Sequence, residues 1–463
     1  MSYSRDRVPY APGPALTERD AEEQALGICF KTGPPSRLGV ELEWLVKDGR
    51  DPALPVDRHR VAEALAPVNM PGALPGEGVL TTEPGGQVEL SSAPAPGLAQ
   101  CVSAVSDDLA ALRGALRLAG LRLAGQGVDP IRPPHRVLDQ PRYLAMEQFF
   151  DRGGPWGRIM MCSTASVQVC VDAGDEGPGL AGFRWRWHLL HAIGPVLVAA
   201  FANSPLRVGS PTGWKSTRQA VWSRLDPSRT RAPAQAEPSV NGSAGSGWPE
   251  HSDPRLAWVS YALDAKVMCI RQPGAPCWDA PPGLTFRDWL RGAGERRPTA
   301  DDLTYHLSTL FPPVRPQGHL ELRMIDAQPD DGWIVPTAVV SALADDPVAA
   351  QAAMAAALDL WHGHRPGAGP APGGPESLWQ RAARLGPADA AIARASRRCF
   401  EEAAAALGRG GAPPSVRDAV NAFAERYVLR DRCPADDRLD DARAAACRPD
   451  RHHDRDMSLE GQP

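Results

Sequence analysis

The sequence has no long hydrophobic run, and this absence argues against a membrane protein built of helices. No segment of the 463 residues approaches the roughly 20 apolar residues of a membrane span. The first residues, Met-Ser-Tyr-Ser-Arg-Asp, are not followed by the apolar core of a signal peptide. The nine cysteines are scattered and include no Cys-x-x-Cys pair, so neither a disulfide framework nor a zinc cluster is predicted. We therefore expect a cytoplasmic protein with free thiols and no membrane partner.

An excess of positive charge is also missing, as are the common nucleotide-binding fingerprints. The formal charge of -5 and the pI near 6.1 argue against general nucleic-acid binding. The Gly-x-Gly-x-x-Gly spacing occurs once, at Gly177–Gly182, but it follows a segment whose alternating polar face does not fit the apolar central strands of a dinucleotide-binding fold. The segment around Gly213 and Lys215 resembles a phosphate loop, but its glycine, lysine and hydroxyl residues do not have the Walker spacing.

What the sequence does contain is a set of short alternating segments with acidic residues on one face. Residues 37–46 predict a strand with Val40, Leu42 and Trp44 on one face. Glu41 and Glu43 lie on the other face, and their spacing of two residues points both carboxylates the same way, about 7 Å apart. An ordinary solvated strand would show the same pattern, so this segment alone does not decide between a surface and a site.

The stretch 81–92 repeats the pattern and adds a turn. Glu89 lies in a predicted strand, and Glu83 precedes it by six residues. The Pro-Gly-Gly sequence between them, followed by Gln87, predicts a turn or bulge that can bring Glu83 over the same surface as Glu89. Carboxylates gathered in this way repel one another and need a cation. An acidic edge strand is the alternative.

Two further strands carry polar residues in the same alternating phase. Residues 167–172 place Gln168 on the polar face, with Cys170 and Asp172 beside it, a pattern that an ordinary exposed face would show equally. Residues 319–326 place Leu320, Leu322 and Met324 on one face and Glu321, Arg323 and, if the strand stays straight, Ile325 on the other. Residues 266–271 predict one more strand. Central strands of a parallel sheet would be apolar throughout. We therefore predict an α+β fold in which an antiparallel sheet has a concave acidic face and helices behind its apolar face.

The remaining chain predicts helices and two disordered ends. Apolar spacing predicts helices over residues 17–30, 58–67, 98–124, 143–150, 183–202, 285–292, 299–310, 337–361, 376–408 and 415–429. We expect residues 1–16 to be disordered, residues 17–431 to form one catalytic domain that includes C-terminal helices over 337–429, and residues 432–463 to be a disordered tail. The Pro/Ala/Ser/Gly-rich segment 231–252 is predicted to be mobile.

Five glutamates on one sheet face indicate metal chemistry. These are Glu41, Glu43, Glu83, Glu89 and Glu321. Carboxylate oxygens select hard cations, so Mg²⁺ or Mn²⁺ is the expected partner. Arginines suit phosphate or carboxylate groups, which the guanidinium fork can hold, and the candidates are Arg218, Arg315 and Arg323. Metal and arginine without a covalent nucleophile motif favour phosphoryl transfer.

Several motifs together resemble a known family. They are Gly39-Val-Glu-Leu-Glu43, Glu83-Pro-Gly-Gly-Gln-Val-Glu-Leu-Ser91, Thr164-Ala-Ser-Val-Gln-Val169, Ala202-Asn-Ser-Pro205, His306-Leu-Ser-Thr-Leu-Phe-Pro-Pro-Val-Arg315 and Leu320-Glu-Leu-Arg323. In this order, over about residues 37–335, they resemble glutamate–cysteine ligases of the plant and bacterial type, most closely the actinobacterial branch in ergothioneine biosynthesis. The resemblance implies a glutamine-synthetase-like catalytic domain that uses ATP and Mg²⁺ to join the γ-carboxyl of L-glutamate to the amine of L-cysteine through γ-glutamyl phosphate.

The resemblance also implies roles for individual residues. Metals that bridge ATP and substrate would be held by Glu41, Glu43, Glu83, Glu89, Gln168 and Glu321. Arg323 would meet the transferring phosphoryl group, and Gln87 would bind substrate. Arg218 and Arg315 would contact glutamate or phosphate, and the resemblance does not decide which arginine binds which group. Plant relatives carry Asn where this chain has Cys170, which puts a polar contact from that position in doubt.

Two alternatives remain open from the sequence. The same metal face would serve a related carboxylate–amine ligase that uses another amine acceptor, because the acceptor pocket cannot be deduced from the sequence. A catalytically silent metal- or nucleotide-binding module is the alternative from another class, although the full set of glutamates and arginines argues against it. The expected partners are small molecules, and the sequence does not indicate an oligomeric state.

Overall fold

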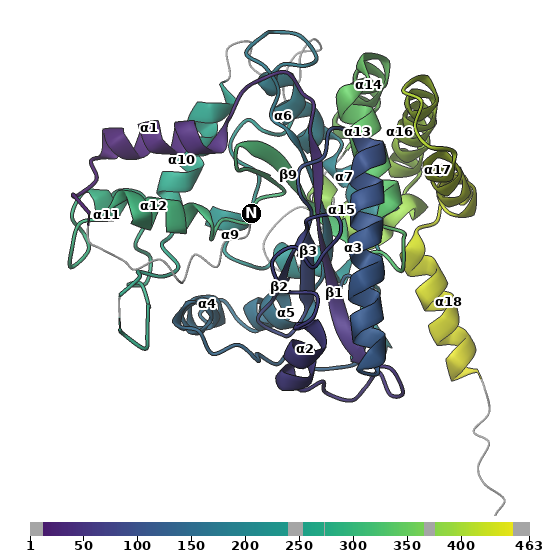
Figure 1. The fold of residues 1–463 in the computed structure, drawn as a ribbon. Helices are drawn as coiled ribbons and strands as arrows, with labels where there is room; N and C mark the ends of the chain where they lie inside the picture. Colours follow the sequence, from purple (N-terminus) through teal and green to yellow (C-terminus); the bar gives the residue numbers. More distant parts are fainter. Residues whose placement is uncertain (1–12, 239–252, 273, 365–375, 448–463) are drawn as a thin grey trace, which may run out of the picture.

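The computed structural model describes residues 13–238, 253–272, 274–364 and 376–447, and its centre is a seven-stranded sheet (Figure 1). The strands are β1 (Leu38–Asp48), β2 (Val79–Thr82), β3 (Val88–Ser91), β4 (Leu121–Ala124), β5 (Ser166–Asp172), β8 (Val314–Pro316) and β9 (His319–Asp326). Their order is β2-β3-β1-β5-β9-β8, with β4 paired to the second half of β1, and every pairing is antiparallel. A separate hairpin consists of β6 (Leu206–Arg207) and β7 (Ser210–Pro211). The predicted antiparallel α+β architecture is confirmed.

The register places the predicted polar residues on one face. Glu43 on β1 lies opposite Glu89 on β3, and Glu41 lies opposite Gln168 on β5. Because directly opposed residues of antiparallel strands point to the same side, these side chains share one face. The alternate residues, such as Leu42 and Val169, are buried in the main hydrophobic core.

A bulge in β9 changes the phase of that strand. Val169 pairs with Leu322, but Val167 pairs with Ile325. One extra β9 residue therefore lies between these pairs, which is the signature of a β-bulge. The expectation that Ile325 continues the polar face is wrong, because Ile325 is buried in the main core. Asp326 pairs with Ser166 and takes the place on the polar face instead.

Helices cover the apolar face of the sheet in two layers. The inner helices α3 (Leu98–Leu118), α7 (Gly194–Ala200) and α13 (Ile334–Asp345) contact the strands, and α14 (Pro347–Gly363), α16 (Ala390–Arg409) and α17 (Pro414–Arg426) pack outside them. In Figure 1, α3, α13, α14, α16 and α17 lie on one side of the sheet, and α1 (Glu18–Cys29), α10 (Pro254–Asp264), α11 (Phe286–Leu290) and α12 (Ala300–Leu307) lie on the other. The remaining helices are α2 (Arg58–Leu65), α4 (Pro141–Asp151), α5 (Trp156–Ser163), α6 (Phe183–Ala192), α8 (Thr217–Trp222), α9 (Pro227–Thr230), α15 (Leu378–Leu385) and α18 (Pro434–Ala446).

Several predicted elements differ from the structure. The helices expected over 183–202, 337–361 and 376–408 are each divided in two, as α6 and α7, α13 and α14, and α15 and α16. The helix expected over 98–124 ends at Leu118, where Gly120 adopts a positive φ of 68° and turns the chain into β4. The strand expected over 266–271 is absent, since this described segment forms only isolated bridges, from Lys266 to Thr285 and from Cys269 to Asp279. β-Branched and apolar residues in a short run do not specify a strand when no neighbouring strand is in reach.

The expectation of disorder from residue 432 onward is wrong for Pro434–Ala446, which form α18. This helix lacks an apolar stripe, but its acidic and basic side chains bind other parts of the protein, including an ion pair between Asp436 and Lys215. Residues 1–12, 239–252 and 448–463, which include most of the segments predicted to be disordered or mobile, lie outside the described residues. All nine cysteines are free, as predicted. Within the described ranges, no helix is long and apolar enough to cross a bilayer.

Candidate active site

The polar face of the sheet gathers all five predicted glutamates. Four are on strands, and Glu83 belongs to the turn between β2 and β3. In that turn the Gly86 N–H donates to the Glu83 carbonyl at 2.8 Å, and the Glu83 N–H donates to the Gln87 carbonyl at 2.8 Å. Gly86 has a φ of 83°, which favours glycine. The turn carries Glu83 back beside Glu43 and Glu41, and burial together with the charges of these two residues raises the pKa of Glu83.

Gln87 anchors this turn from behind. Its Nε2 donates to the carbonyls of Met161 at 3.2 Å and Thr164 at 2.9 Å, and its Oε1 accepts from the Gly85 N–H at 3.0 Å. The side chain is only 3% exposed and both amide hydrogens are used. Gln87 therefore holds the turn that positions Glu83, and its substrate-binding role stays a prediction.

Arg315 holds Glu321 in a forked ion pair. Arg315 Nε donates to Glu321 Oε2 at 3.0 Å, and Nη2 contacts both carboxylate oxygens at 2.9 Å. Glu321 is fully buried, which opposes its ionisation, but Arg315 and Arg323 outweigh burial and lower its pKa to about 2. The remaining Nη1 of Arg315 points to the Leu310 carbonyl at 3.4 Å. Arg315 therefore has its donors engaged by protein groups, and its contacts favour the positioning of Glu321 over direct binding of substrate.

Arg323 and Gln168 together connect β9, β5 and β1 on this face. Arg323 donates to Glu321 on its own strand and to the Gln168 amide oxygen on β5. Gln168 Nε2 in turn donates to Glu43 Oε1 at 3.0 Å, and the Ser166 hydroxyl donates to Glu43 Oε2 at 2.9 Å. Burial lowers the pKa of Arg323, but the surrounding carboxylates outweigh this effect and raise it. Its buried Nε has no hydrogen-bond partner in the described part of the chain.

The other carboxylates have no directly paired cation. Within the described residues, Glu41, Glu43, Glu83 and Glu89 form no ion pair, although the charges of Arg315 and Arg323 act on Glu41 and that of Arg323 on Glu83 at longer range. Burial, together with neighbouring carboxylates, raises the pKa of Glu41 and of Glu83 to about 7. The same causes raise the pKa of Glu89 well above its ordinary value, although the hydroxyl of Thr81 donates to it at 3.0 Å. The protein therefore concentrates more negative charge here than its own cations neutralise.

This donor set fits a hard divalent cation. Uncompensated carboxylate oxygens are the ligands that Mg²⁺ prefers, and cation binding would relieve the repulsion that raises the pKa of Glu41 and Glu83. In the described ranges no three acidic, histidine or cysteine side chains already converge as a metal cage. Mg²⁺ itself usually binds through one or two carboxylates together with substrate phosphates and waters, so such a cage is not required.

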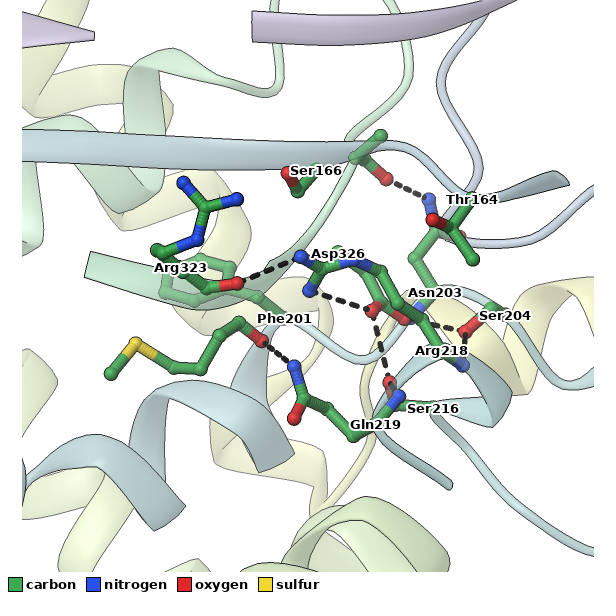
Figure 2. Close-up of polar contacts among 12 residues, drawn as sticks. Thr164, Ser166, Phe201, Asn203, Ser204, Ser216, Arg218, Gln219, Arg323 and Asp326 are labelled. Carbon is green, nitrogen blue, oxygen red and sulfur yellow. Dashed lines mark hydrogen bonds and ion pairs between the residues drawn. The ribbon is translucent and has the colours of Figure 1, made fainter. Parts of the chain in front are cut away.

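Arg218 of α8 approaches the same face beside Arg323 (Figure 2). Its Nη2 donates to the Arg323 carbonyl at 2.8 Å, and its Nη1 lies 4.0 Å from Asp326 Oδ1. The guanidinium also stacks over the Trp222 ring at 4.6 Å. Arg218 is 1% exposed, and among the described residues its Nε and Nη1 have no hydrogen-bond partner. Buried donors without partners are costly, so they indicate a place for an anionic ligand.

Sequence reasoning missed several residues that support the site. Ser166 has the same alternating phase as Gln168, and this phase was the available signal. Thr81 and Ser91 both donate hydrogen bonds to Glu89. Each lies opposite an acidic residue in the sheet, and this pairing could have suggested that they support the carboxylates. Asp326 gave no usable signal, because its place on the polar face depends on the bulge in β9.

Comparison with known proteins then identifies the family. The model of the glutamate-cysteine ligase family 2 (GCS2) matches residues 37–455. The chain belongs to this family. The glutamate–cysteine ligase EgtA of Mycobacterium tuberculosis is 39% identical over 423 residues, which cover 90% of this chain and 88% of that protein. EgtA of Mycolicibacterium smegmatis is 39% identical over 426 residues, with 90% of each chain covered.

A plant glutamate–cysteine ligase matches a shorter part of the chain. The chloroplastic glutamate–cysteine ligase of Medicago truncatula is 32% identical over 271 residues, 56% of this chain and 49% of that protein. Among solved structures, the glutamate–cysteine ligase of Francisella tularensis in complex with AMP aligns with a TM-score of 0.45 and 12% identity, over 90% of this chain and 86% of that chain. The family resemblance predicted from the motifs is confirmed, and the protein is a ligase.

Proposed function

We propose that this protein joins the γ-carboxyl of L-glutamate to the amine of L-cysteine, at the expense of ATP, to give γ-glutamylcysteine. The observation that carries the proposal is the sheet face itself: carboxylates without a directly paired cation lie beside two arginines, Arg218 and Arg323, that have buried, unused donors. Such a face fits a metal–polyphosphate group and a carboxylate substrate side by side. The names of the mycobacterial and plant relatives support the two amino-acid substrates.

Divalent cations, Mg²⁺ or Mn²⁺, would be held by Glu41, Glu43, Glu83, Glu89, Gln168 and Glu321. When bound, they supply charge neutralisation and Lewis-acid polarisation of phosphate oxygens. Within the protein, Gln168 holds Glu43 and Arg323 through its amide, and Arg315 holds Glu321. We therefore assign to Gln168 and Arg315 the positioning of these two carboxylates.

The reaction has two steps. An oxygen of the glutamate γ-carboxylate attacks the γ-phosphorus of ATP, the bond to the β,γ-bridging oxygen breaks, and ADP leaves. The amine nitrogen of cysteine then attacks the acyl carbon of γ-glutamyl phosphate, phosphate leaves with the bonding pair, and the nitrogen loses a proton. Arg323, at the centre of the face, donates to the phosphoryl oxygens. Arg218, at its edge, donates to the phosphoryl group or to a glutamate carboxylate.

Burial of these groups also protects the intermediate. An acyl phosphate hydrolyses in water, so a site whose arginines and acidic floor are largely excluded from solvent favours transfer to the amine. We place the reaction in the cytoplasm, where ATP and both amino acids are present, and in ergothioneine biosynthesis on the basis of the motif resemblance.

The test is phosphate release by the purified full-length chain with ATP, glutamate, Mg²⁺ and a panel of amines. We expect a strong preference for cysteine and loss of turnover in Glu321→Gln and Arg323→Ala, with unchanged far-UV circular dichroism. Arg443→Ala is the matched control, because Arg443 is exposed and pairs only with Asp440 among the described residues. Preference for another amine would assign a related carboxylate–amine ligase. No turnover with any amine, or near-wild-type rates in both site variants, would refute the proposal.

A further inference from the structure

Helix α18 holds the loop that contains Lys215. Asp436 forms an ion pair with Lys215 Nζ. The next residue along this loop, Ser216, caps α8 and donates its hydroxyl to Asp326 Oδ1 at 2.9 Å. The backbone of the loop is also held from the other side, because the Ser216 N–H donates to the Ala383 carbonyl at 2.8 Å. The ion pair from α18 to Lys215 therefore lies one residue away from Ser216, which donates a hydrogen bond to Asp326.

The same helix holds a second loop in the same manner. Arg438 donates through Nε to Asn203 Oδ1 and through Nη2 to the Gly125 carbonyl at 3.0 Å. Asn203 itself donates its backbone N–H to Asp326 Oδ2 at 2.9 Å, and the hydroxyl of the following residue, Ser204, donates to the same oxygen at 2.7 Å. Arg438 is thus bonded to a residue that binds Asp326 directly.

Asp326 is the junction between these two loops and the active site (Figure 2). Its carboxylate is 1% exposed and accepts the three hydrogen bonds from Asn203, Ser204 and Ser216. It faces Arg218 Nη1 at 4.0 Å, and Arg218 is tied through Nη2 to the Arg323 carbonyl. Moving either loop would move the carboxylate that fixes the direction of the Arg218 guanidinium.

The composition of α18 shows that it does not serve mainly to complete the hydrophobic core. Its sequence, Pro-Ala-Asp-Asp-Arg-Leu-Asp-Asp-Ala-Arg-Ala-Ala-Ala, buries only Pro434 and Ala435. Ala435 and the preceding Cys433 form a small separate cluster with Ala202, and the Ala435 N–H donates to the Ala202 carbonyl at 2.9 Å. Most of the other contacts of the helix are ion pairs and hydrogen bonds, which are directional and fix geometry more than they add stability.

We propose that α18 is a clamp that positions Arg218 for the reaction, acting through the loops at 203–204 and 215–216 on Asp326. The inference rests on the proposed function, in which Arg218 binds an anionic group of a substrate. Arg438 and Asp326 are then positioning residues of the active site. A C-terminal helix that the sequence does not distinguish from a solvated tail becomes part of the catalytic unit.

The test compares Arg438→Met with Arg443→Met in the full-length chain. Both variants remove an arginine from α18, but Arg443 is exposed and contacts only Asp440 in the described part of the protein. We expect Arg438→Met to lower kcat/KM for glutamate about ten- to a hundredfold, as the loss of a charge-assisted hydrogen bond would. We expect Arg443→Met to match the wild type. Similar melting temperatures in the two variants separate positioning from general stability.

A double-mutant cycle with Arg218→Lys tests whether Arg438 acts through Arg218. If Arg438 acts through Arg218, the double variant loses less than the product of the two single losses. A multiplicative loss would overturn the inference, and so would an Arg438→Met enzyme with wild-type kinetics. Arg438→Lys, which keeps one donor, replaces the Met variant in both comparisons if that variant does not fold, and it should show the same pattern to a smaller extent.

Hydrogen–deuterium exchange provides a readout that does not need turnover. The backbone amides of residues 203, 204, 206 and 215–219 should exchange faster in Arg438→Met than in Arg443→Met or the wild type. If the wild-type protein makes no product, the proposed function fails, and exchange still decides whether the helix holds the two loops. Equal exchange in all three proteins would overturn the clamp even if the enzyme is active.

Discussion

Replacement of Arg315 by methionine should destabilise the protein because it leaves Glu321 buried without its forked partner. Glu321 is fully buried and receives three of its hydrogen bonds from Arg315. The ion pairs lower its pKa from 4.5 to about 2, a difference equivalent to about 3 kcal/mol. Removal of one partner of a buried pair typically costs about 3–5 kcal/mol. Since Arg323 remains in contact, we expect a loss of about 3 kcal/mol at pH 7.

The sign of the pH dependence follows from the lowered pKa. A carboxylate whose pKa is lower in the folded state stabilises the protein above its unfolded pKa of 4.5, and this contribution is lost as the pH falls toward 2. The difference between Arg315→Met and the wild type should therefore be largest near neutral pH and shrink on acidification. The double variant Glu321→Gln/Arg315→Met should be more stable than Arg315→Met, because an amide leaves no unpaired charge.

Urea unfolding followed by tryptophan fluorescence measures these free energies. Arg113→Met is a control of the same chemistry on the surface, where Arg113 pairs with the exposed Asp331 at 2.7 Å, and it should cost less than about 1 kcal/mol. The reasoning would be refuted if Arg315→Met cost no more than this control. A double variant that is less stable than Arg315→Met would show that the charge of Glu321 is not the source of the loss.

Three further outcomes are expected. Burial and charge repulsion raise the pKa of Glu41 and Glu83 to about 7, so the contribution of these two residues to stability is full below pH 4.5 and is lost as the pH rises through 7. Mg²⁺ should restore this stability, and the Mg²⁺ affinity measured by calorimetry should rise between about pH 6 and 8. An affinity that does not change with pH would contradict the metal assignment. Gly85→Ala should lower kcat, because its Cβ would lie 2.2 Å from a backbone oxygen of α5, while Gly114→Ala, with open space around it in α3, should leave kcat unchanged. Ser166→Ala removes a hydrogen bond to the metal face and should cost about 1 kcal/mol of transition-state stabilisation, measured as kcat/KM; no change would make the bond dispensable.

Much of the site was predictable because strand alternation has a fixed period of two. Once residues 37–46 and 167–172 were recognised as strands, the shared face of Glu41, Glu43 and Gln168 followed from geometry. The Pro-Gly-Gly turn placed Glu83 for a similarly local reason. The roles of the arginines were harder to predict, because the sequence shows where an arginine is but not which groups its side chain contacts. Arg315 was expected at the substrate, and its engagement by Glu321 appears only when β8 and β9 are paired.

The helices also show that sequence patterns reveal contacts between neighbouring residues but not contacts with distant ones. The helix predicted over 299–310 is present as α12, and it begins with a capping box in which Thr299 and Asp302 lie only three positions apart. Helix α18 was missed because its stability comes from partners more than 200 residues away, Lys215 and Asn203. Local propensity and periodicity carry no information about such contacts, so a charged segment with distant partners looks like a solvated tail.

The bulge in β9 shows why a correct strand prediction can still give the wrong residues. Alternation predicts Ile325 on the polar face only if every residue advances the strand by one step. One inserted residue reverses the phase, which buries Ile325 in the core and turns Asp326 toward the site. Straight pairing would expose an isoleucine to the acidic hollow and bury a carboxylate among aliphatic side chains, both of which are unfavourable. The contacts of Asp326 with Arg218, Ser204 and Ser216 therefore favour the bulge. The alternation within one strand carries no information about these contacts, so it does not predict the bulge.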